Sequence, residues 1–336
     1  TVNYNKKQLK RAMEAISNAK KPLLYVGGGA ILSNCAYEIR ELAKKLNIPA
    51  VETLMARGVM GDENPLFSGM LGMHGEFAAN MAAHETDLLI SLGARFDDRV
   101  TGRLDEFASK AKIIHVDIDP TSIAKLVVPD YPIVGDLKIT VNAMIEAIDS
   151  GEHEFNDYTN WVELLRDYRE KEPLRYIDSN EVIKPQWPIQ RVGKLLGAKA
   201  IISTDVGQHQ MWTAQFYPFS YPRQWITSGG LGTMGFGLPA AMGVARALKG
   251  TDKVSINFTG DGSILMNIQE LMTCVEYELP VINIILNNNY LGMVRQWQTM
   301  FYGNRLSETD LSAQPNFKML VEAFGGYGYR VTTKEE

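Results

Sequence analysis

Apolar and polar positions along residues 1–150 predict helices and short buried strands in alternation. Leu9, Met13 and Ile16 recur at helical spacing, whereas the apolar run Pro22–Val26 ends at Gly27. The pattern predicts helices over 6–18 and 36–46, and strands over 22–26, 49–53, 88–92 and 113–118. Short apolar strands separated by helical segments favour a parallel sheet with helices on both faces.

A second series of the same kind follows residue 185. Its predicted helices cover 188–196, 237–248 and 267–277, and its predicted strands cover 200–204, 254–258 and 281–286. Between the two series, a charged and aromatic helical stretch is flanked by Gly151 and Pro173, which favours a linker. The sequence therefore predicts an α/β protein with two doubly wound parallel-sheet domains, 1–150 and 186–336, joined by a linker over 151–185.

The composition is that of a globular chain without a strongly charged surface. The 336 residues carry a formal net charge of −5, and no block of Lys or Arg occurs. We therefore expect neither nucleic acid nor an anionic membrane surface as a partner. No apolar run reaches the roughly 18 residues that a membrane span requires, and the first residues lack a signal-peptide core.

The two cysteines, Cys35 and Cys274, lie in separate halves of the chain, in stretches that we predict to be helical. So few cysteines exclude a disulfide framework and favour a reducing, cytoplasmic location. The chain begins without Met and stops shortly after the strand-like residues 329–331. We therefore expect it to be a piece of a longer protein.

Two polar turns follow predicted strands in the second half of the chain. Gly260-Asp261-Gly262 and Asn287-Asn288 each come directly after a β-rich run. A right-handed crossover makes these strands parallel, so their carboxyl ends meet at the sheet edge where open α/β sheets bind ligands. Asp261 and Asn288 can then be neighbours. A carboxylate and an amide oxygen, with room for water and phosphate oxygens, suit Mg2+.

Each motif by itself is typical of a surface turn. Their combination at two strand ends favours the metal site, and it resembles the signature of thiamine diphosphate enzymes, in which Gly-Asp-Gly precedes Asn-Asn by about two dozen to thirty residues. Gly262 would let the backbone approach phosphate groups closely. The helix predicted after it presents free N–H groups to anionic oxygens.

The resemblance covers nearly the whole chain and is to the catalytic subunit of acetolactate synthase. The segments that carry it are Leu71–Gly75, Arg95–Gly102, His115–Asp119, Gly207–Trp212, Ser228–Ala241 and Leu291–Trp297. Gly-Asp-Gly indicates only the cofactor. The Arg-Phe-Asp-Asp-Arg segment and the Gly-Met-Val-x-Gln-Trp segment point to this enzyme among the thiamine enzymes.

The resemblance implies a Mg2+ site formed by Asp261, the Asn288 side chain and the backbone carbonyl of Tyr290. Many relatives have His at the Tyr290 position, and a backbone ligand tolerates that change. The residues implied to contact thiamine diphosphate are Val206, Gly207, Gln208, His209, Gly232, Met234, Gly262, Ser263, Gly292 and Met293. Met234 matches the bulky apolar residue that bends the cofactor into a V shape; the alternative is an ordinary core methionine.

The implied reaction is that of a transferase in branched-chain amino acid biosynthesis: pyruvate condenses with a second 2-keto acid, and CO2 is lost. Pyruvate as acceptor gives 2-acetolactate, and 2-ketobutyrate gives 2-aceto-2-hydroxybutyrate. The cofactor takes up the electrons, while the protein supplies binding and electrostatics. The residues implied to act in catalysis are Met234, Gln208, Arg99, Trp297 and Met293.

Within this set, Met293 and Trp297, together with Val294, match the acceptor pocket of the family. Arg99 matches the group that meets the acceptor carboxylate, which suits an arginine because its planar fork can donate two parallel hydrogen bonds. A surface ion pair with Asp97 or Asp98 is the alternative for Arg99.

The first half resembles the FAD-binding region of the same family. The residues implied around FAD are Gly28, Gly29, Leu71, Met73, His74, Gly93, Arg95, Asp97, Val100, Asp117, Ile118 and Asp136. The glycines after the first strand can approach a pyrophosphate, although the G-x-G-x-x-G spacing is absent. By itself His74 is more typical of a core or capping histidine. In this family FAD is not consumed by the net reaction.

The resemblance also implies what this sequence lacks. The glutamate that activates the aminopyrimidine lies in an N-terminal domain of the family, and a C-terminal segment helps to close the site. We therefore expect the 336 residues alone to be inactive. The family further implies a homodimer or a larger oligomer with the active site between subunits, and a small regulatory subunit.

Two other interpretations stay open. One is another thiamine diphosphate enzyme, of the pyruvate oxidase or glyoxylate carboligase type, which would share the metal signature. The second is a noncatalytic cofactor-binding module. A nicotinamide dehydrogenase is disfavoured because no dinucleotide fingerprint occurs.

Overall fold

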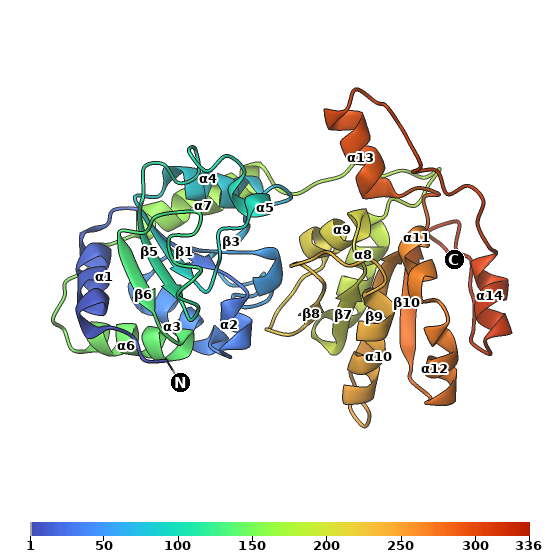
Figure 1. Ribbon diagram of the computed structural model, residues 1–336, viewed down its shortest axis with the longest axis horizontal. Coiled ribbons are helices and arrows are strands. Elements are labelled where there is room, and N and C mark those ends of the chain that lie inside the picture. The colour runs from blue at the N-terminus through green and yellow to red at the C-terminus, as the bar shows by residue number, and fades with distance from the viewer. Residues whose placement is uncertain (1) are drawn as a thin grey trace. The chain divides into compact units, whose positions relative to one another are not determined.

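The computed structural model describes residues 2–336, which form two compact units. Unit 1 contains the chain up to Arg175 together with Phe219–Pro222, and unit 2 contains Tyr176–Pro218 and Arg223–Glu336. Figure 1 shows a parallel sheet with helices around it in each unit. The predicted fold class of two parallel-sheet α/β domains is confirmed.

Unit 1 is built on a six-stranded parallel sheet in the order β3-β2-β1-β4-β5-β6. The strands are β1 (Pro22–Val26), β2 (Ala50–Glu52), β3 (Phe67–Met70), β4 (Leu88–Leu92), β5 (Lys112–Asp117) and β6 (Tyr131–Val134). The helices are α1 (Lys6–Asn18), α2 (Gly29–Leu32), α3 (Ala36–Leu46), α4 (Phe77–Glu85), α5 (Asp98–Thr101), α6 (Leu137–Asp149) and α7 (Thr159–Lys171). A short 3-10 helix, η1, covers Leu54–Ala56.

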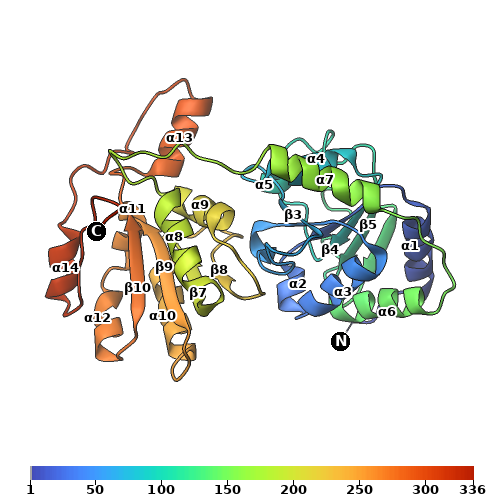
Figure 2. The ribbon, with the colours of Figure 1, turned by 180° about the vertical axis from the view of Figure 1, so that it is seen from behind.

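Two hydrophobic layers cover the faces of this sheet. Successive residues of β1 point to opposite faces, so Leu24 packs with α1, α3 and α6, whereas Leu23 packs with α4 and α7. Figures 1 and 2 show α4 and α7 together on one side of the sheet and α3 and α6 on the other. Coverage of both faces explains why β1 and β4 are apolar at nearly every position.

Unit 2 contains a four-stranded parallel sheet in the order β10-β9-β7-β8. The strands are β7 (Ala200–Thr204), β8 (Trp225–Ile226), β9 (Val254–Gly260) and β10 (Val281–Leu286). The helices are α8 (Gln186–Leu196), α9 (Gln208–Phe216), α10 (Gly237–Ala247), α11 (Asp261–Ile264), α12 (Glu270–Glu276), α13 (Gly292–Phe301) and α14 (Phe317–Ala323), with 3-10 helices η2 (Gly197–Lys199) and η3 (Leu265–Asn267).

Most of the predicted elements are present, with ends that move by a few residues. The sequence pattern missed the strands β3, β6 and β8, the helices α4, α6, α9, α13 and α14, and the four-residue helices α2, α5 and α11. The missed strands β3 and β6 lie at the two edges of the first sheet, where Pro132 is tolerated and apolar alternation is weak. Cys35 directly precedes α3 and is not helical, contrary to the prediction, while Cys274 lies in α12.

The predicted linker contains a helix that packs on unit 1. Trp161 and Leu165 of α7 are buried with the core of that unit, and the Trp161 ring N–H donates to the carbonyl oxygen of Pro22 at 3.0 Å. Residues 172–184, after α7, carry no helix or strand. The structure therefore assigns α7 to unit 1, and the boundary between the two units falls at Arg175.

A short segment from later in the sequence, Phe219–Pro222, also belongs to unit 1. The backbone N–H of Asp62 donates to the carbonyl oxygen of Phe219 at 2.8 Å, and the Arg57 guanidinium lies over the Phe219 ring. Arg57 is buried and forms ion pairs with Glu52 and Asp62. This buried charge cluster holds a segment that is about 160 residues distant in sequence.

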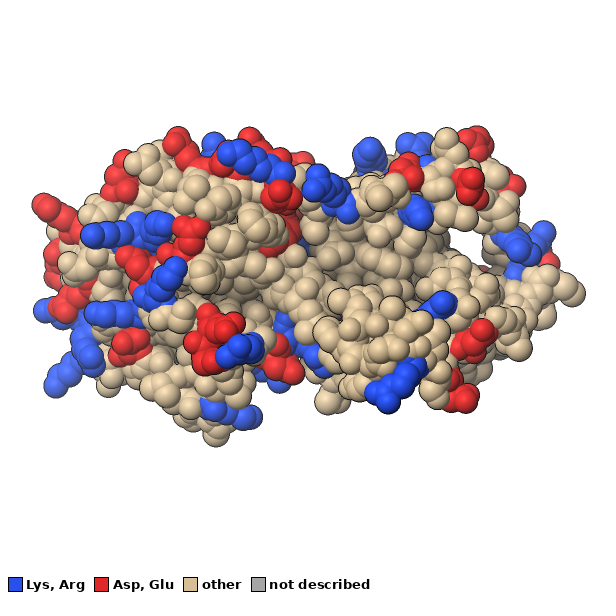
Figure 3. Space-filling view, turned by 90° about the horizontal axis from the view of Figure 1, so that it is seen from above, with Lys and Arg blue, Asp and Glu red and all other residues tan. Residues whose placement is uncertain are grey.

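Charged side chains of both signs are interspersed over the face of unit 1 that Figure 3 shows. Within residues 2–336, no helix combines the length and the apolar character that crossing a membrane requires.

Candidate cofactor site

The two polar turns predicted to form the site lie beside each other in unit 2. Strands β9 and β10 pair in parallel, with Gly260 opposite Leu286, so the turns that follow leave the sheet at the same level. Asp261 begins α11, and Asn288 lies in the turn after β10. The juxtaposition follows from the parallel crossover, as predicted from the spacing.

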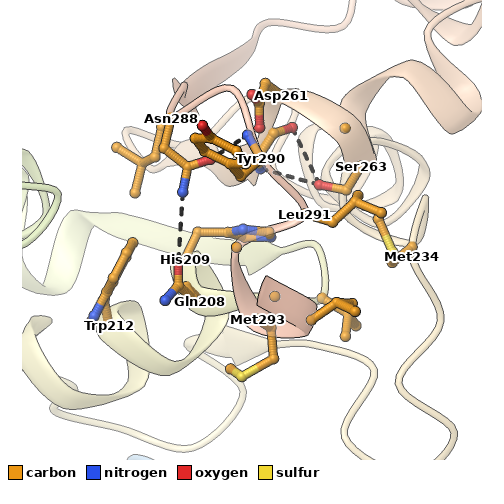
Figure 4. A pocket seen from close by; sticks show the side chains of 17 residues that line it. Gln208, His209, Trp212, Met234, Asp261, Ser263, Asn288, Tyr290, Leu291 and Met293 are labelled. Atoms are coloured by element: carbon orange, nitrogen blue, oxygen red, sulfur yellow. Dashed lines mark hydrogen bonds between the residues drawn. The ribbon is translucent and has the colours of Figure 1, made fainter. Parts of the chain in front are cut away.

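A pocket of about 440 Å3, including space open to solvent, lies at this edge of the sheet. Its lining residues are Val206, Gly207, Gln208, His209, Trp212, Met234, Gly260, Asp261, Gly262, Ser263, Leu286, Asn288, Tyr290, Leu291, Gly292, Met293 and Val294. In Figure 4, Asp261, Asn288 and Tyr290 gather at one side of the pocket, and Met234 stands apart from them.

The polar groups around Asp261 are oxygen-rich. Asp261 is 2% exposed, and its carboxylate accepts a hydrogen bond from the side-chain amide of Gln314. The Gln314 carbonyl oxygen in turn accepts from Asn287 Nδ2 at 2.8 Å. Asn288 Oδ1 accepts from the backbone N–H of Tyr290 at 3.0 Å, which tightens the turn.

The turn after β10 is held from outside as well. Asn289 has a left-handed backbone with φ of 61°, which Asn adopts more readily than most residues. The N–H of Leu311 donates to the carbonyl oxygen of Asn289, and the N–H of Leu291 donates to that of Thr309. The ligand-bearing turn is therefore fixed by a neighbouring chain segment as well as by its own hydrogen bonds.

This donor set fits a hard cation. It offers a carboxylate, a side-chain amide oxygen and a backbone carbonyl, and Mg2+ prefers such oxygen ligands and keeps some of its water. Among residues 2–336, no group of three or more His, Cys, Asp or Glu side chains is arranged to hold a metal. A site of this composition would form no such group, because only one of its ligands is an acidic side chain.

Gly292 and Gln208 form another wall of the pocket, where the absence of a side chain at Gly292 leaves room for Gln208. A Cβ added at Gly292 would lie 2.1 Å from Gln208 Oε1, so a larger residue cannot replace this glycine without moving Gln208. Gln208 itself donates to Gln296 Oε1 at 2.8 Å and accepts from Asn288 Nδ2 at 3.5 Å. Gln208 therefore connects the start of α9 to α13 and to the turn after β10.

His209 is the buried titratable group of this wall. It is 6% exposed, and burial lowers the pKa of its imidazole to about 4, so the ring is neutral at pH 7. Its Nε2 atom has no hydrogen-bond partner within the described residues. Since a buried polar atom without a partner is costly, this nitrogen indicates a polar ligand in the pocket.

The remaining predicted residues of unit 2 lie around the pocket in different ways. Ser263 lines it, and its hydroxyl accepts from the backbone N–H of Gly260 at 3.1 Å. Gly232 and Trp297 are not among the lining residues. Trp297 packs on Phe301 within α13, with ring centroids 5.4 Å apart.

In unit 1, the predicted FAD residues come together at the carboxyl ends of the strands. The N–H of Gly29 donates to the carbonyl oxygen of Gly93 at 3.0 Å, and a Cβ at Gly29 would lie 2.7 Å from the Gly93 Cα. β1 and β4 are neighbours in the sheet: the chain order runs from β1 to β3 toward one edge and from β4 to β6 toward the other. Ligands of α/β sheets bind at such a switch point. The two glycine turns therefore meet where a ligand site is expected.

The other predicted segments of unit 1 lie at the same edge. The N–H of Met73 donates to the carbonyl oxygen of Arg99 at 2.9 Å, which joins segment 71–74 to segment 95–100. His74 is half-buried, and burial, with Arg99 nearby, lowers the pKa of its imidazole. Arg99 is exposed, and its backbone N–H donates to Asp97 Oδ1.

Three of the predicted acidic residues have local structural roles. Asp97 pairs with Arg95 and caps α5. Asp136 caps α6 by accepting from the N–H of Ile139 at 3.1 Å. Asp117 ends β5 and accepts from the N–H of Asp119. Of the remaining predicted residues, Gly28, Leu71 and Ile118 lie in the loops that follow β1, β3 and β5, and Val100 lies in α5, which follows β4.

Sequence reasoning missed several polar residues beside these sites. Asp205 and Asn267 contact the turn that carries Met234, and Gln314 contacts Asp261. His115 is fully buried in β5, and its Nε2 lies 3.0 Å from the Ala94 carbonyl oxygen. For Asp205, the local sequence offers one indication, which is a polar residue directly after a predicted strand. No local sequence pattern indicates a role for Asn267 or Gln314.

Comparison with known protein families identifies both halves of the chain. Residues 9–144 match the central domain of thiamine pyrophosphate enzymes, and residues 205–336 match their C-terminal thiamine pyrophosphate binding domain. The chain belongs to the thiamine pyrophosphate enzymes. The second match contains every residue that lines the unit 2 pocket.

Individual relatives agree with this assignment. The chain is 45% identical to the acetolactate synthase isozyme 3 large subunit of Escherichia coli and 45% identical to the acetolactate synthase large subunit of Haemophilus influenzae, in each case over 100% of this chain and 58% of the relative. It is 46% identical to an acetolactate synthase of Mycobacterium bovis over 98% of this chain and 54% of the relative. The predicted resemblance is confirmed, and the chain spans somewhat more than half the length of these relatives.

Proposed function

We propose that this chain forms the larger part of an acetolactate synthase catalytic subunit, which condenses pyruvate with pyruvate or 2-ketobutyrate and releases CO2. The observation that carries the proposal is the pocket at the ends of β9 and β10, which gathers Asp261, Asn288 and Tyr290 in a chain 45% identical to acetolactate synthase large subunits. The reaction belongs to the biosynthesis of valine, leucine and isoleucine.

In this proposal Mg2+ is held by Asp261, Asn288 and the Tyr290 carbonyl. The support is chemical, because all three groups offer hard oxygen ligands and line one pocket. The Asp261 carboxylate is buried and accepts a hydrogen bond from the side-chain amide of Gln314, which holds it at the edge of the pocket.

The diphosphate of the cofactor would contact Gly207, Gln208 and His209 at the start of α9, and Gly262, Ser263 and Gly292 on the other side, with Val206, Gly232 and Met293 nearby. The Nε2 atom of the neutral His209 ring, which has no partner within the described residues, would accept a hydrogen bond from a donor group of the ligand or of bound water. Bound thiamine diphosphate supplies the electron sink for decarboxylation.

We assign the substrate-facing roles to Met234, Gln208, Met293, Trp297 and Arg99. Met234 lines the pocket as an apolar wall, and Met293 lines it from the start of α13. Trp297 lies one turn further along the same helix, so its side chain is on the same side of α13 as that of Met293. Arg99 is exposed and belongs to unit 1; its planar guanidinium suits the acceptor carboxylate.

FAD would bind at the switch point of unit 1. The support is the meeting of Gly29 with Gly93 at the ends of adjacent strands, together with the contact of Met73 with Arg99 beside it. The proposed set is Gly28, Gly29, Leu71, Met73, His74, Gly93, Arg95, Asp97, Val100, Asp117, Ile118 and Asp136.

Product identification tests the proposed function. The full-length natural protein is supplied with pyruvate, Mg2+, thiamine diphosphate and FAD, and the products are identified by mass spectrometry. Acetolactate is the expected product, and addition of 2-ketobutyrate should give 2-aceto-2-hydroxybutyrate. Acetyl phosphate with peroxide would instead show an enzyme of the pyruvate oxidase type.

The proposal extends to partners and location. The relatives are named large subunits, which supports a small regulatory partner for this protein as well. We further propose a cytoplasmic homodimer or larger oligomer with its active site between subunits. Sedimentation of the full-length protein at several concentrations tests the oligomer, and a monomer with full activity would contradict it.

A further inference from the structure

We propose that Asp205 and Asn267 are positioning residues that clamp the Gly235 peptide from both sides and thereby fix Met234 at the wall of the cofactor pocket. Neither of the two is among the residues that line the pocket. The inference rests on the proposed function, because it gives Met234 a task in shaping the bound cofactor.

The first half of the clamp is Asp205, which directly follows β7 and is 0% exposed. Its Oδ1 accepts from the backbone N–H of Gly235 at 2.6 Å, and its Oδ2 accepts from the Thr259 hydroxyl at 3.0 Å. Thr259 belongs to β9, so the carboxylate joins the ends of two neighbouring strands to the turn. Both of its oxygens are thereby used.

The second half is Asn267, at the end of η3. Its Nδ2 donates to the carbonyl oxygen of Gly235 at 2.7 Å. Gly235 has a φ of 90°, and a Cβ there would lie 2.7 Å from Asn267 Nδ2, so only glycine fits between the two side chains. Both the N–H and the C=O of one residue are therefore held by side chains from different elements.

These two hydrogen bonds fix the position of the turn that carries Met234, which has few hydrogen bonds of its own. Residues 228–236 form no helix or strand, and further side-chain bonds hold mainly their first half: the Ser228 hydroxyl accepts from the N–H of Thr233 at 3.1 Å, and Gln210 Nε2 donates to the Ser228 carbonyl oxygen at 3.2 Å. Methionine has a flexible side chain, so the place of its sulfur and methyl groups depends on its backbone. A shift of about 1 Å in a positioning group can slow catalysis about a hundredfold.

A purely structural role predicts a different behaviour. In this alternative, the sole task of Asp205 is to stabilise α10. It lies next to the start of that helix, where a Cβ at Gly237 would be 2.8 Å from its carboxylate. The matched control is Ser255, a 2% exposed residue of β9 whose hydroxyl donates to the carbonyl oxygen of Ala241 in α10 at 2.8 Å. Ser255→Ala weakens a different contact of the same helix and leaves the Gly235 peptide untouched.

The test compares Asp205→Ala, Asn267→Ala, Asp205→Asn and Ser255→Ala in the full-length enzyme. Three quantities are measured: the affinity for thiamine diphosphate with Mg2+, the rate of deuterium exchange at C2 of the bound cofactor, and kcat with KM for pyruvate. We expect Asp205→Ala and Asn267→Ala to lower the exchange rate and kcat at least about tenfold, with affinity and KM changed less than about threefold.

The remaining variants make the outcome decisive. Asp205→Asn keeps an acceptor for Gly235 and should regain most of the exchange rate, while Ser255→Ala should exchange as the wild type does even if its melting temperature falls. Wild-type exchange in both alanine variants would overturn the inference. If Asp205→Ala does not fold, Asn267→Ala, at a partly buried position, still decides it. A wild-type enzyme that exchanges C2–H but forms no acetolactate would contradict the proposed function alone.

Discussion

At the scale of single residues, buried polar side chains set the chemistry of both units. His209 is kept neutral by burial, and the Asp261 carboxylate is buried and accepts a hydrogen bond from the side-chain amide of Gln314. In unit 1, His115 is 0% exposed, and burial lowers the pKa of its imidazole. Its ring contacts Phe96 edge-on, with centroids 5.0 Å apart, and its Nδ1 has no partner within the described residues. Two of these groups lead to predictions: Asp261 for cofactor binding, and His115 for the pH dependence of stability.

Replacement of Asp261 tests the proposed metal site. We expect Asp261→Ala in the full-length enzyme to weaken Mg2+-dependent binding of thiamine diphosphate at least about tenfold, because the site loses its only acidic ligand. FAD retention should stay unchanged, since the proposed FAD residues lie in unit 1. Calorimetric titration with and without Mg2+ measures the first effect, and flavin absorbance of the purified protein measures the second.

The control for this variant is Asp252→Ala, which removes an exposed acid of the same unit. It should bind thiamine diphosphate as the wild type does. If Asp261→Ala loses FAD to the same extent as thiamine diphosphate, Asp261 has a structural role and the metal assignment is wrong.

His115 makes the stability of unit 1 depend on pH. Its folded-state pKa lies below the ordinary value of about 6.5, so between these two values the unfolded chain binds a proton that the folded chain does not. Stability should therefore fall as the pH drops from 7 toward 5. Asp117 faces the ring with Oδ2 3.9 Å from Nε2, which offsets part of the effect. Urea denaturation at several pH values measures the slope.

His115→Gln removes this titration, so its stability should change less over the same pH range. His84→Gln, at an exposed position of α4, is the control and should keep the wild-type slope. Equal slopes in the wild type and His115→Gln would show that other groups govern acid sensitivity.

At the scale of elements, α7 shows how a segment that resembles a linker becomes part of a core. Its exposed face is rich in charge, but Trp161, Val162 and Leu165 are buried against unit 1. Tyr168 donates to Glu85 of α4 at 2.7 Å, which adds a polar contact between the two helices. The helix covers β1 from the side opposite α1, so unit 1 depends on it for one of its two hydrophobic layers.

We expect Trp161→Ala to destabilise unit 1 by about 3–5 kcal/mol, the range for removing a large buried aromatic side chain. The loss includes the hydrogen bond from its ring N–H to Pro22. Hydrogen exchange of β1 peptides in a urea series reports unit 1 separately from unit 2. Arg166→Ala, an exposed change on the same helix, should alter stability by less than about 0.5 kcal/mol. A loss below about 1 kcal/mol for Trp161→Ala would show that α7 is only loosely attached.

At the scale of the whole molecule, the described pocket and the residues proposed for FAD belong to different units. Every residue that lines the described pocket belongs to unit 2, and every proposed FAD residue belongs to unit 1. The single acidic residue among those that line the pocket is Asp261, which we assign to the metal. Activation of thiamine needs a further carboxylate, which the family resemblance assigns to a domain outside these 336 residues.

We therefore expect the 336-residue chain by itself to form no acetolactate when pyruvate, Mg2+, thiamine diphosphate and FAD are supplied. The full-length protein, assayed in parallel, is the control and should be active. Acetolactate produced by the 336-residue chain alone would show that it contains a sufficient activating group, and the assignment of that role to another domain would then be wrong.

The sequence alone determined the fold class and the two polar turns that we propose to hold the metal. Apolar periodicity is local, so it predicted β1, β4, β9 and β10 directly, whereas β6 was missed because it has only four residues and contains Pro132. The meeting of Asp261 with Asn288 was also predictable, because a parallel crossover allows only one arrangement of the two strand ends.

Only the tertiary structure decided which polar residues hold these turns in place. Asp205, Asn267 and Gln314 contact residues that are 30, 32 and 53 positions away in sequence, and no local pattern marks such pairs. It likewise decided that α7 belongs to a core and that His115 is neutral and buried. The physical reason is that periodicity and turn chemistry act between near neighbours, whereas burial and hydrogen-bond partners depend on how distant elements pack.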